Sequence, residues 1–160
     1  MNEGVEWAVH SCLNLAWLGC ERAVPAAKLA AYYELPVAYL NKQLQLLVRA
    51  GIVNSVPGPR GGFRLARPPE KVTLMDVVAA IDGAESAFRC TEIRRRGGSG
   101  GAPEAQYRKA CAVDSAMRRA ELAWRTELAA QTLADVMTTV ERGAPDVPNR
   151  VRRWFDDTRS

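Results

Sequence analysis

The chain has 160 residues, of which 48% are hydrophobic and 25% are charged, values typical of a globular domain that exclude wholesale disorder. The apolar run at residues 12–20 follows two glutamates, and no run has the roughly 18 uninterrupted apolar residues of a membrane span, so we expect neither signal peptide nor transmembrane helix. Four irregularly spaced cysteines do not form the disulfide framework of a small secreted domain. We therefore expect a soluble, cytoplasmic protein whose cysteines serve as ligands or thiols.

The first half of the chain shows helical periodicity. Three- and four-residue apolar spacings, together with capping residues, predict helices over residues 4–18, 26–33, 36–50 and 74–81. Pro25 suits the first turn of the second helix, and Gly51 ends the third. Thr73 is a suitable N-cap for the fourth helix, which Gly83 ends.

Two short strand-like runs, 52–56 and 63–66, separate the third and fourth helices. They flank a loop rich in glycine and proline, PGPRGG, which predicts a hairpin with a loop longer than two residues. The predicted order of elements is that of a winged helix-turn-helix: a helix, a helix-turn-helix, a hairpin and a further helix. The predicted fold class is therefore mainly α with a small β-hairpin wing.

The second half of the chain contains one long periodic segment. Periodicity is absent over residues 84–109, where three arginines (94–96) and a glycine-rich run (97–101) predict an exposed flexible loop. The segment 114–142 predicts a single helix about 43 Å long. Because so small a domain cannot cover that length, we expect it to be a C-terminal dimerisation helix that packs against a second copy. The remaining residues, 143–160, are expected to be loosely held, although Val151, Trp154 and Phe155 could dock.

The excess positive charge lies in one segment. Residues 36–71 contain six cations and one anion, whereas the other 124 residues contain 16 cations and 17 anions. This concentration favours contact with nucleic acid over a merely solvated face.

The third helix is the expected DNA-reading helix, because side chains near its N-terminus can reach base edges in the major groove. Gln43 can pair with adenine, Lys42 can reach guanine or a phosphate, and Tyr39 suits a phosphate. Arg60 at the hairpin tip can enter the minor groove, and Arg64 would hold the backbone. The residues expected to contact DNA are Ala38, Tyr39, Lys42, Gln43, Arg60 and Arg64. The alternative is a winged helix that contacts another protein.

The same region carries the run AYLNKQLQLLVRAGIVNSVPGPRGGFRLARPPEKVTLMDVVAAIDG. This run closely resembles the signature of the Rrf-two family of bacterial transcription regulators; the resemblance covers residues 5–83 and continues loosely to about residue 140. It implies a homodimer that binds a pseudo-palindromic operator in double-stranded DNA as a repressor. In many members an iron–sulfur cluster controls that binding.

The cysteines depart from the family's usual cluster pattern of three closely spaced cysteines. Only Cys90 and Cys111 occur between the fourth helix and the long helix. An iron–sulfur cluster needs four ligands, and nitrogen can replace sulfur. Glu6 and His10, the only histidine, could supply the balance, because residues four apart lie on one face of a helix.

The set Glu6, His10, Cys90 and Cys111 resembles the RsrR subgroup, which carries a 2Fe–2S cluster. That resemblance implies that these residues bind the cluster across the dimer, with thiolates from one subunit and Glu6 and His10 from the other. Two thiolates, an imidazole and a carboxylate also suit zinc. A metal-free or zinc-binding regulator or adaptor, controlled by a protein partner or by thiol chemistry, is therefore the alternative.

A switch through the first helix follows from these assignments. Trp7 adjoins Glu6 and would move with that ligand, and the first helix packs against the reading helix. Reduction or loss of the cluster should therefore weaken operator binding. An enzyme is not expected, because the sequence contains neither a set of nucleophile, base and orienting group nor a phosphate-binding loop.

These inferences divide the chain into four segments. They are a winged helix-turn-helix DNA-binding domain (1–83), a cluster-binding loop (84–111), a dimerisation helix (112–142) and a flexible tail (143–160).

Overall fold

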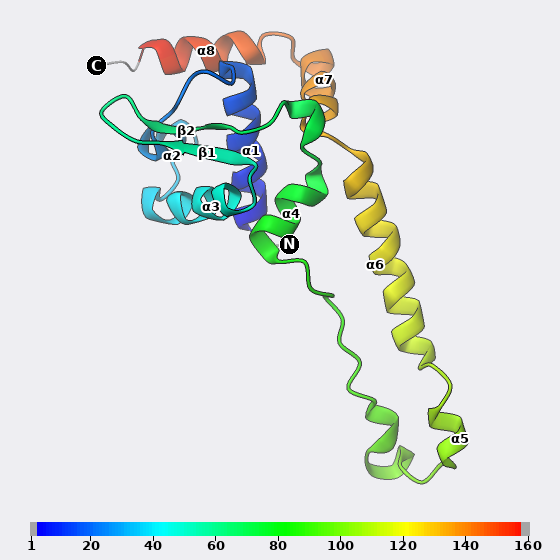
Figure 1. Cartoon of the computed structure of the whole chain (residues 1–160). Coiled ribbons are helices and arrows are strands. Elements are labelled where there is room, and N and C mark those ends of the chain that lie inside the picture. Colours follow the sequence, from blue (N-terminus) through cyan, green and yellow to red (C-terminus); the bar gives the residue numbers. More distant parts are fainter. Residues whose placement is uncertain (1–2, 158–160) are drawn as a thin grey trace. The chain divides into compact units, whose positions relative to one another are not determined.

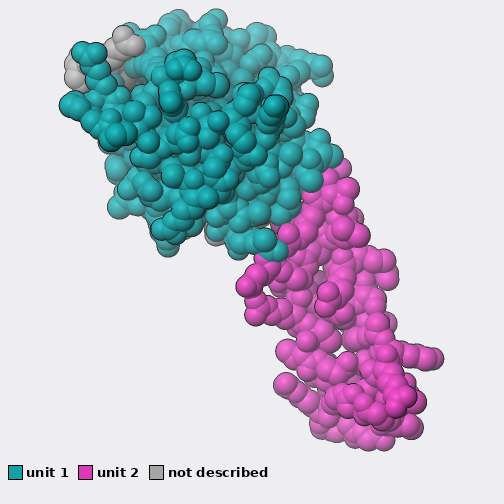
Figure 2. All heavy atoms as spheres, viewed as in Figure 1, with its two compact units in different colours: residues 1–84, 128–160 teal, residues 85–127 magenta. Residues whose placement is uncertain are grey.

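The computed structural model describes residues 3–157, and the chain divides into two compact units (Figure 2). The first unit comprises residues 1–84 and 128–160, and the second comprises residues 85–127. Residues 1–2 of the predicted DNA-binding domain and 158–160 of the predicted tail lie outside the described residues. None of the described helices combines the length and the apolar character that a membrane span requires.

The first unit contains a winged helix-turn-helix (Figure 1), which confirms the predicted fold class. In chain order its elements are α1 (Glu3–Leu18), α2 (Ala26–Tyr32), α3 (Val37–Arg49), β1 (Val53–Val56), β2 (Gly62–Leu65), η1 (Pro69–Lys71) and α4 (Leu74–Asp82). The predicted cap is present, because the Thr73 hydroxyl accepts a hydrogen bond from the Asp76 N–H while the Asp76 carboxylate accepts one from the Thr73 N–H. The second unit contains η2 (Ile93–Arg95), η3 (Gly97–Ser99), α5 (Glu104–Tyr107) and most of α6 (Ala112–Ala130).

The wing is attached to the helical part by a third extended segment. Strands β1 and β2 pair antiparallel, with Val53 opposite Leu65 and Val56 opposite Gly62. Val24 pairs with Phe63 on the other side of β2 through two hydrogen bonds of 2.8 Å. A Cβ at Gly62 would lie 2.3 Å from the Val24 carbonyl, so only glycine permits this close approach.

The core lies between α1 and the helix-turn-helix. Buried residues of α1, including Cys12 and Leu15, form one cluster with buried residues of α2, α3, α4 and the wing. On α3 the stripe Leu40, Leu44 and Leu47 is fully buried. Helix α1 is therefore packed against α3, the expected DNA-reading helix, by side chains that exclude water.

The predicted single helix over 114–142 is interrupted, and this prediction is wrong. Helix α6 ends at Ala130, and α7 (Leu133–Gly143) begins after Thr132. Thr132 caps α7 through a reciprocal pair with Asp135, and its backbone forms a bridge with Thr73. The N-terminal caps of α4 and α7 therefore lie side by side. The capping hydrogen bonds of α7 satisfy backbone groups that a continuous helix would have paired within itself.

Most of the predicted flexible tail is a docked helix, α8 (Val147–Asp157), which corrects that expectation. Val151 and Phe155 are buried against the core, and the Tyr32 ring stacks on Phe155 at 5.4 Å between centroids. Arg22 donates hydrogen bonds of 2.8 Å to the Asp156 carboxylate and to the Phe155 carbonyl. The apolar residues recur at helical spacing, and their burial outweighs the polar composition of the segment.

We predict that Phe155→Ala lowers the free energy of unfolding by about 3–5 kcal/mol, because it removes a fully buried aromatic ring and leaves a cavity. Urea denaturation followed by circular dichroism measures this change. Arg153→Ala, on the exposed side of α8, is the control and should change stability by no more than about 0.5 kcal/mol. Equal effects of the two substitutions would contradict the docking of α8.

Candidate nucleic-acid interface and metal-ligand residues

One face of α3 is solvent-exposed and polar. Ala38, Asn41, Lys42 and Gln45 are exposed at spacings of three and four residues, so they share one side of the helix. Tyr39 lies beside this face with 43% of its surface exposed. The sequence interpretation omitted Asn41, although its spacing from Ala38 and Lys42 places it on the exposed face.

Gln43 is not on that face, which corrects its expected role as a base reader. It is only 4% exposed and lies on the stripe of Leu40, Leu44 and Leu47. Its Oε1 atom has no hydrogen-bond partner in the structure. A residue three positions after Leu40 and four before Leu47 faces the core in a helix of 3.6 residues per turn.

The wing places its two arginines differently. Arg60 is exposed in the loop of the hairpin, between the two strands. Arg64 is on β2, where its guanidinium lies 3.5 Å from the carboxylate of Glu21. Arg60 also lines a pocket of about 600 Å³ together with Arg22 and Lys28, so cations from three segments meet there.

Glu6 and His10 are exposed on one side of α1, as their spacing predicts. Both line an open pocket of about 230 Å³ with Trp7, Tyr33 and Leu35. The pocket therefore joins α1 to the turn between α2 and α3.

Trp7 is half-buried and connects α1 with the reading helix. Its ring meets the Tyr39 ring edge-on, with 5.0 Å between centroids and 75° between planes. Glu6, which precedes Trp7, is thus one residue away from a side chain in direct contact with α3.

Tyr33 forms the opposite wall of the pocket. Its ring lies edge-on to His10 at 5.5 Å between centroids, and its hydroxyl is 3.3 Å from Oδ1 of Asn14. Burial raises the pKa of Tyr33 to about 12, because the effect of desolvation is larger than the opposing effect of the Asn14 hydrogen bond. The hydroxyl is therefore protonated at neutral pH and can donate to Asn14.

Cys90 and Cys111 lie in the second unit, as free thiols on either side of a folded loop. Cys90 is exposed and Cys111 is half-buried. Among residues 3–157 no group of three or more histidine, cysteine, aspartate or glutamate side chains is arranged to hold a metal ion.

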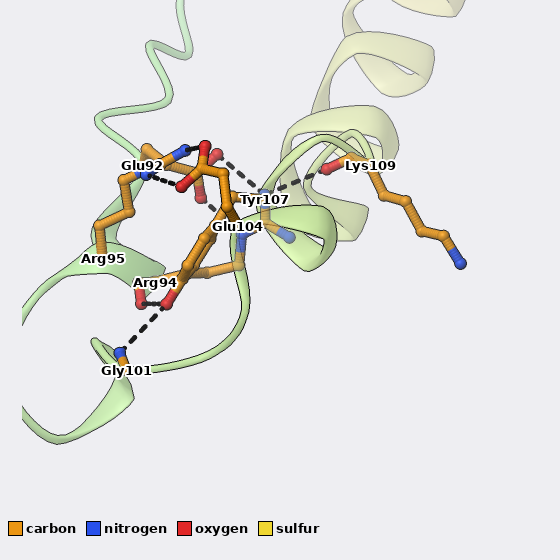
Figure 3. A network of polar contacts seen from close by, with 7 residues as sticks. All are labelled: Glu92, Arg94, Arg95, Gly101, Glu104, Tyr107 and Lys109. Atoms are coloured by element: carbon orange, nitrogen blue, oxygen red, sulfur yellow. Dashed lines mark hydrogen bonds and ion pairs between the residues drawn. The ribbon is translucent and has the colours of Figure 1, made fainter.

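The segment between these cysteines is held by a polar network (Figure 3) and contains short helical turns instead of the irregular loop that was expected, although most of its described residues are exposed as predicted. Arg95 donates two hydrogen bonds of 2.9 and 2.8 Å to Glu104, and its guanidinium lies 4.4 Å from the centroid of the Tyr107 ring. The Tyr107 hydroxyl lies 3.4 Å from the Gly101 N–H and 3.3 Å from the Arg94 carbonyl. These interactions compensate for the conformational freedom of the glycines.

Arg94 extends the network towards Cys111. It donates to the Glu92 carboxylate and, over 3.2 Å, to the Lys109 carbonyl two residues before Cys111. Its pKa is raised above the ordinary arginine value, first by the Glu92 hydrogen bond and then by the negative charge of Glu92, which together outweigh the opposing effect of desolvation.

The other two cysteines have different surroundings. Cys12 is fully buried in the α1 stripe, where burial raises its pKa to about 12, so it is an inert core residue. Cys20 is exposed in the link between α1 and α2.

A helix-turn-helix with a hairpin wing and an exposed polar face on its second helix defines a class of DNA-binding proteins. The family model described as "Rrf2: Iron-dependent Transcriptional regulator" matches residues 1–139, and the chain belongs to this family. It is accordingly a DNA-binding transcriptional regulator and not an enzyme.

Two of three similar proteins are named as transcriptional regulators. The chain is 28% identical to the HTH-type transcriptional regulator YwgB of Bacillus subtilis, over 88% of this chain and 85% of the relative. It is 32% identical to protein aau3 of Rhizobium meliloti, over 86% and 84%. It is 33% identical to the regulator IscR of Aliivibrio salmonicida, over 52% of this chain and 50% of IscR.

Two solved structures have the same fold. The structure of T. potens IscR superposes with a TM-score of 0.67 at 22% identity and covers 90% of each chain. That of CymR, the global cysteine regulator of B. subtilis, gives 0.65 at 21% identity and covers 87% of this chain and 96% of CymR.

We predict that Glu104→Gln makes chymotrypsin cleave severalfold faster after Tyr107, because the charged pair with Arg95 holds the guanidinium over that ring. The pKa of Glu104 is lowered by the Arg95 hydrogen bond, so the interaction is complete above pH 4.5 and is lost as the pH falls further. Timed digestion at neutral pH, followed by mass spectrometry, measures cleavage. Glu70→Gln, in the other unit, is the control, and equal cleavage of both variants would reject the ordered loop.

Proposed function

We propose that this protein is a redox-responsive repressor that acts as a homodimer, carries a 2Fe–2S cluster and resembles the RsrR subgroup of its family. The observation that carries the proposal is the position of Glu6 and His10 on α1, in the pocket that Trp7 shares. Trp7 is in turn in edge-on contact with Tyr39 of the reading helix, at 5.0 Å. A change at these two side chains therefore acts one contact away from the DNA-binding surface.

The donor atoms suit an iron–sulfur cluster of mixed ligation. Glu6 and His10 are exposed side by side on α1, and Cys90 and Cys111 are free thiols. Clusters with two nitrogen ligands in place of sulfur have higher reduction potentials than clusters with four cysteines. When bound, the cluster would supply a one-electron redox couple.

The division of the donors between the two units supports a shared site in a dimer. None of the described residues of α6 is buried within the single chain. Its apolar side chains Val113, Met117 and Trp124 are exposed at helical spacing. An apolar stripe left open on a long helix is suited to a second copy of the same helix. In the proposed dimer Cys90 and Cys111 of one subunit meet Glu6 and His10 of the other.

The exposed face of α3 and the tip of the wing supply the DNA contacts in this proposal. Asn41 replaces Gln43 as the residue that can pair with adenine, since it shares a face with Ala38 and Lys42. Lys42 contacts a guanine or a phosphate, Tyr39 a phosphate, and Arg60 the minor groove. Arg64 contacts the backbone after it releases Glu21.

We predict that Asn41→Ala weakens operator binding by about 1–3 kcal/mol and relaxes the preference for one base pair in each half-site. Gln43→Met is the matched comparison on the same helix. It should leave base preference unchanged, because the side chain is buried and its Oε1 atom is unpaired. Binding selection on randomised operators measures both, and a changed preference in Gln43→Met alone would reverse the assignment.

We predict that protein purified without oxygen shows visible absorption bands that are lost in both Cys90→Ser and Cys111→Ser, because a cluster missing one thiolate is not retained. Cys20→Ser is the matched control and should keep the bands, since Cys20 is exposed in the other unit. The oxidised cluster-bound protein should bind the operator more tightly than the reduced or cluster-free protein. A colourless wild type, or equal operator affinity of all three forms, would refute the proposal.

Sharing of the ligands between subunits is tested by mixing two inactive variants. Neither His10→Ala nor Cys90→Ser alone should hold a cluster. In a heterodimer of the two, one of the two sites combines an intact α1 with intact cysteines, so iron should return to half of the sites. No recovery would place all four ligands within one chain.

A further inference from the structure

The α1 residues that line the pocket make two aromatic contacts with the helix-turn-helix. One is made by Trp7 and the other by His10. Trp7 reaches Tyr39 on α3, whereas His10 meets Tyr33 at the end of α2. Each of the two proposed α1 ligands thus lies at or next to an aromatic side chain that leads to a different part of the DNA-binding motif.

Tyr33 is fixed to the turn that positions the reading helix. It is the C-cap of α2, and the next residue, Glu34, has a left-handed backbone with φ of 55°. The turn is closed by two hydrogen bonds, from the Leu35 N–H to the Ala30 carbonyl at 2.9 Å and from the Glu34 N–H to the Ala31 carbonyl at 3.3 Å. Because α3 begins at Val37, a displacement of this turn changes the start of the reading helix.

The far end of the Tyr33 side chain is tied to α1. Its hydroxyl contacts Oδ1 of Asn14, which is fully buried and lies one helical turn after His10. Tyr33 therefore bridges the helix that bears His10 and the turn that precedes α3. The Tyr33 ring also lines the adjacent open pocket of about 230 Å³.

We propose that Tyr33 is a positioning residue that transmits a displacement of His10 to the turn between α2 and α3. This inference rests on the proposed role of His10 as a ligand. Tyr33 itself binds neither the cluster nor DNA. It acts in parallel with Trp7, so both the start of α3 and its exposed face respond to the state of α1.

The contact between His10 and Tyr33 can be tested in cluster-free protein. His10 is the only histidine of the chain, so its imidazole gives a single set of side-chain resonances. Tyr33→Leu should shift these resonances because the ring that lies edge-on to the imidazole is removed. Tyr32→Phe is the matched control and should leave the histidine resonances unchanged. It keeps an aromatic ring at position 32 and leaves the Tyr33 ring in place, and the Tyr32 side chain packs against Trp154 and Phe155 of α8.

The coupling is tested by the ratio of operator affinities of the oxidised and the reduced protein. Tyr33→Leu should reduce this ratio by about two- to thirtyfold, the range of single-residue effects on coupling between sites. Tyr33→Phe keeps the ring but loses the Asn14 contact, and it should reduce the ratio by less. The visible spectrum is recorded for each variant, so that loss of the cluster is distinguished from loss of coupling.

If Tyr33→Leu and Tyr33→Phe both keep the wild-type ratio of operator affinities, with unchanged cluster spectra, the role of Tyr33 is overturned and the proposed function is left intact. If Tyr33→Leu does not fold, an unchanged ratio in Tyr33→Phe overturns the role by itself. A colourless wild type refutes the proposed function instead, and the histidine resonances then still show whether the ring contact exists.

Discussion

The packing of α1 against the helix-turn-helix is the interaction on which the rest of the structure depends. Cys12 and Leu15 bury one side of α1 in the common core, and the same helix contacts α3, α4, α7, α8 and the wing strand β2. The opposite side presents Glu6 and His10 beside an open pocket. One helix thus joins the hydrophobic core to two of the four proposed ligands, and the other two come from the second unit.

The sequence was sufficient for the winged fold because its local signals agreed with its tertiary packing. Thr73 caps α4 as its residue type suggests, and Gly62 permits the close approach of Val24. Glu6 and His10 came together as predicted, since a spacing of four residues on a helix fixes their relation without any long-range contact. Their relation to Cys90 and Cys111 depends on assembly, which a single sequence does not encode locally.

The errors arose where local and tertiary preferences compete. Gln43 was assigned to DNA contact by its place near the start of the third helix, but a residue on the buried stripe of a helix faces the core. The break before α7 had a readable signal in the Thr132 to Asp135 capping box, which the continuous apolar stripe obscured. The glycines of the second unit suggested an irregular loop, whereas Arg95 contacts Glu104 and Tyr107, nine and twelve residues further along the chain, through side-chain interactions that composition does not reveal.

The interruption at Gln131 and Thr132 has a consequence for the stability of α7. The Leu133 N–H bonds to the Val72 carbonyl and the Leu74 N–H to the Gln131 carbonyl, both at 2.9 Å, so the start of α7 is hydrogen-bonded to the segment that leads into α4. Because both bonds join backbone atoms, they do not depend on the side chains at these positions. Helix α7 should therefore unfold in one cooperative step with the winged helix-turn-helix, and not open separately as the end of a long helix would.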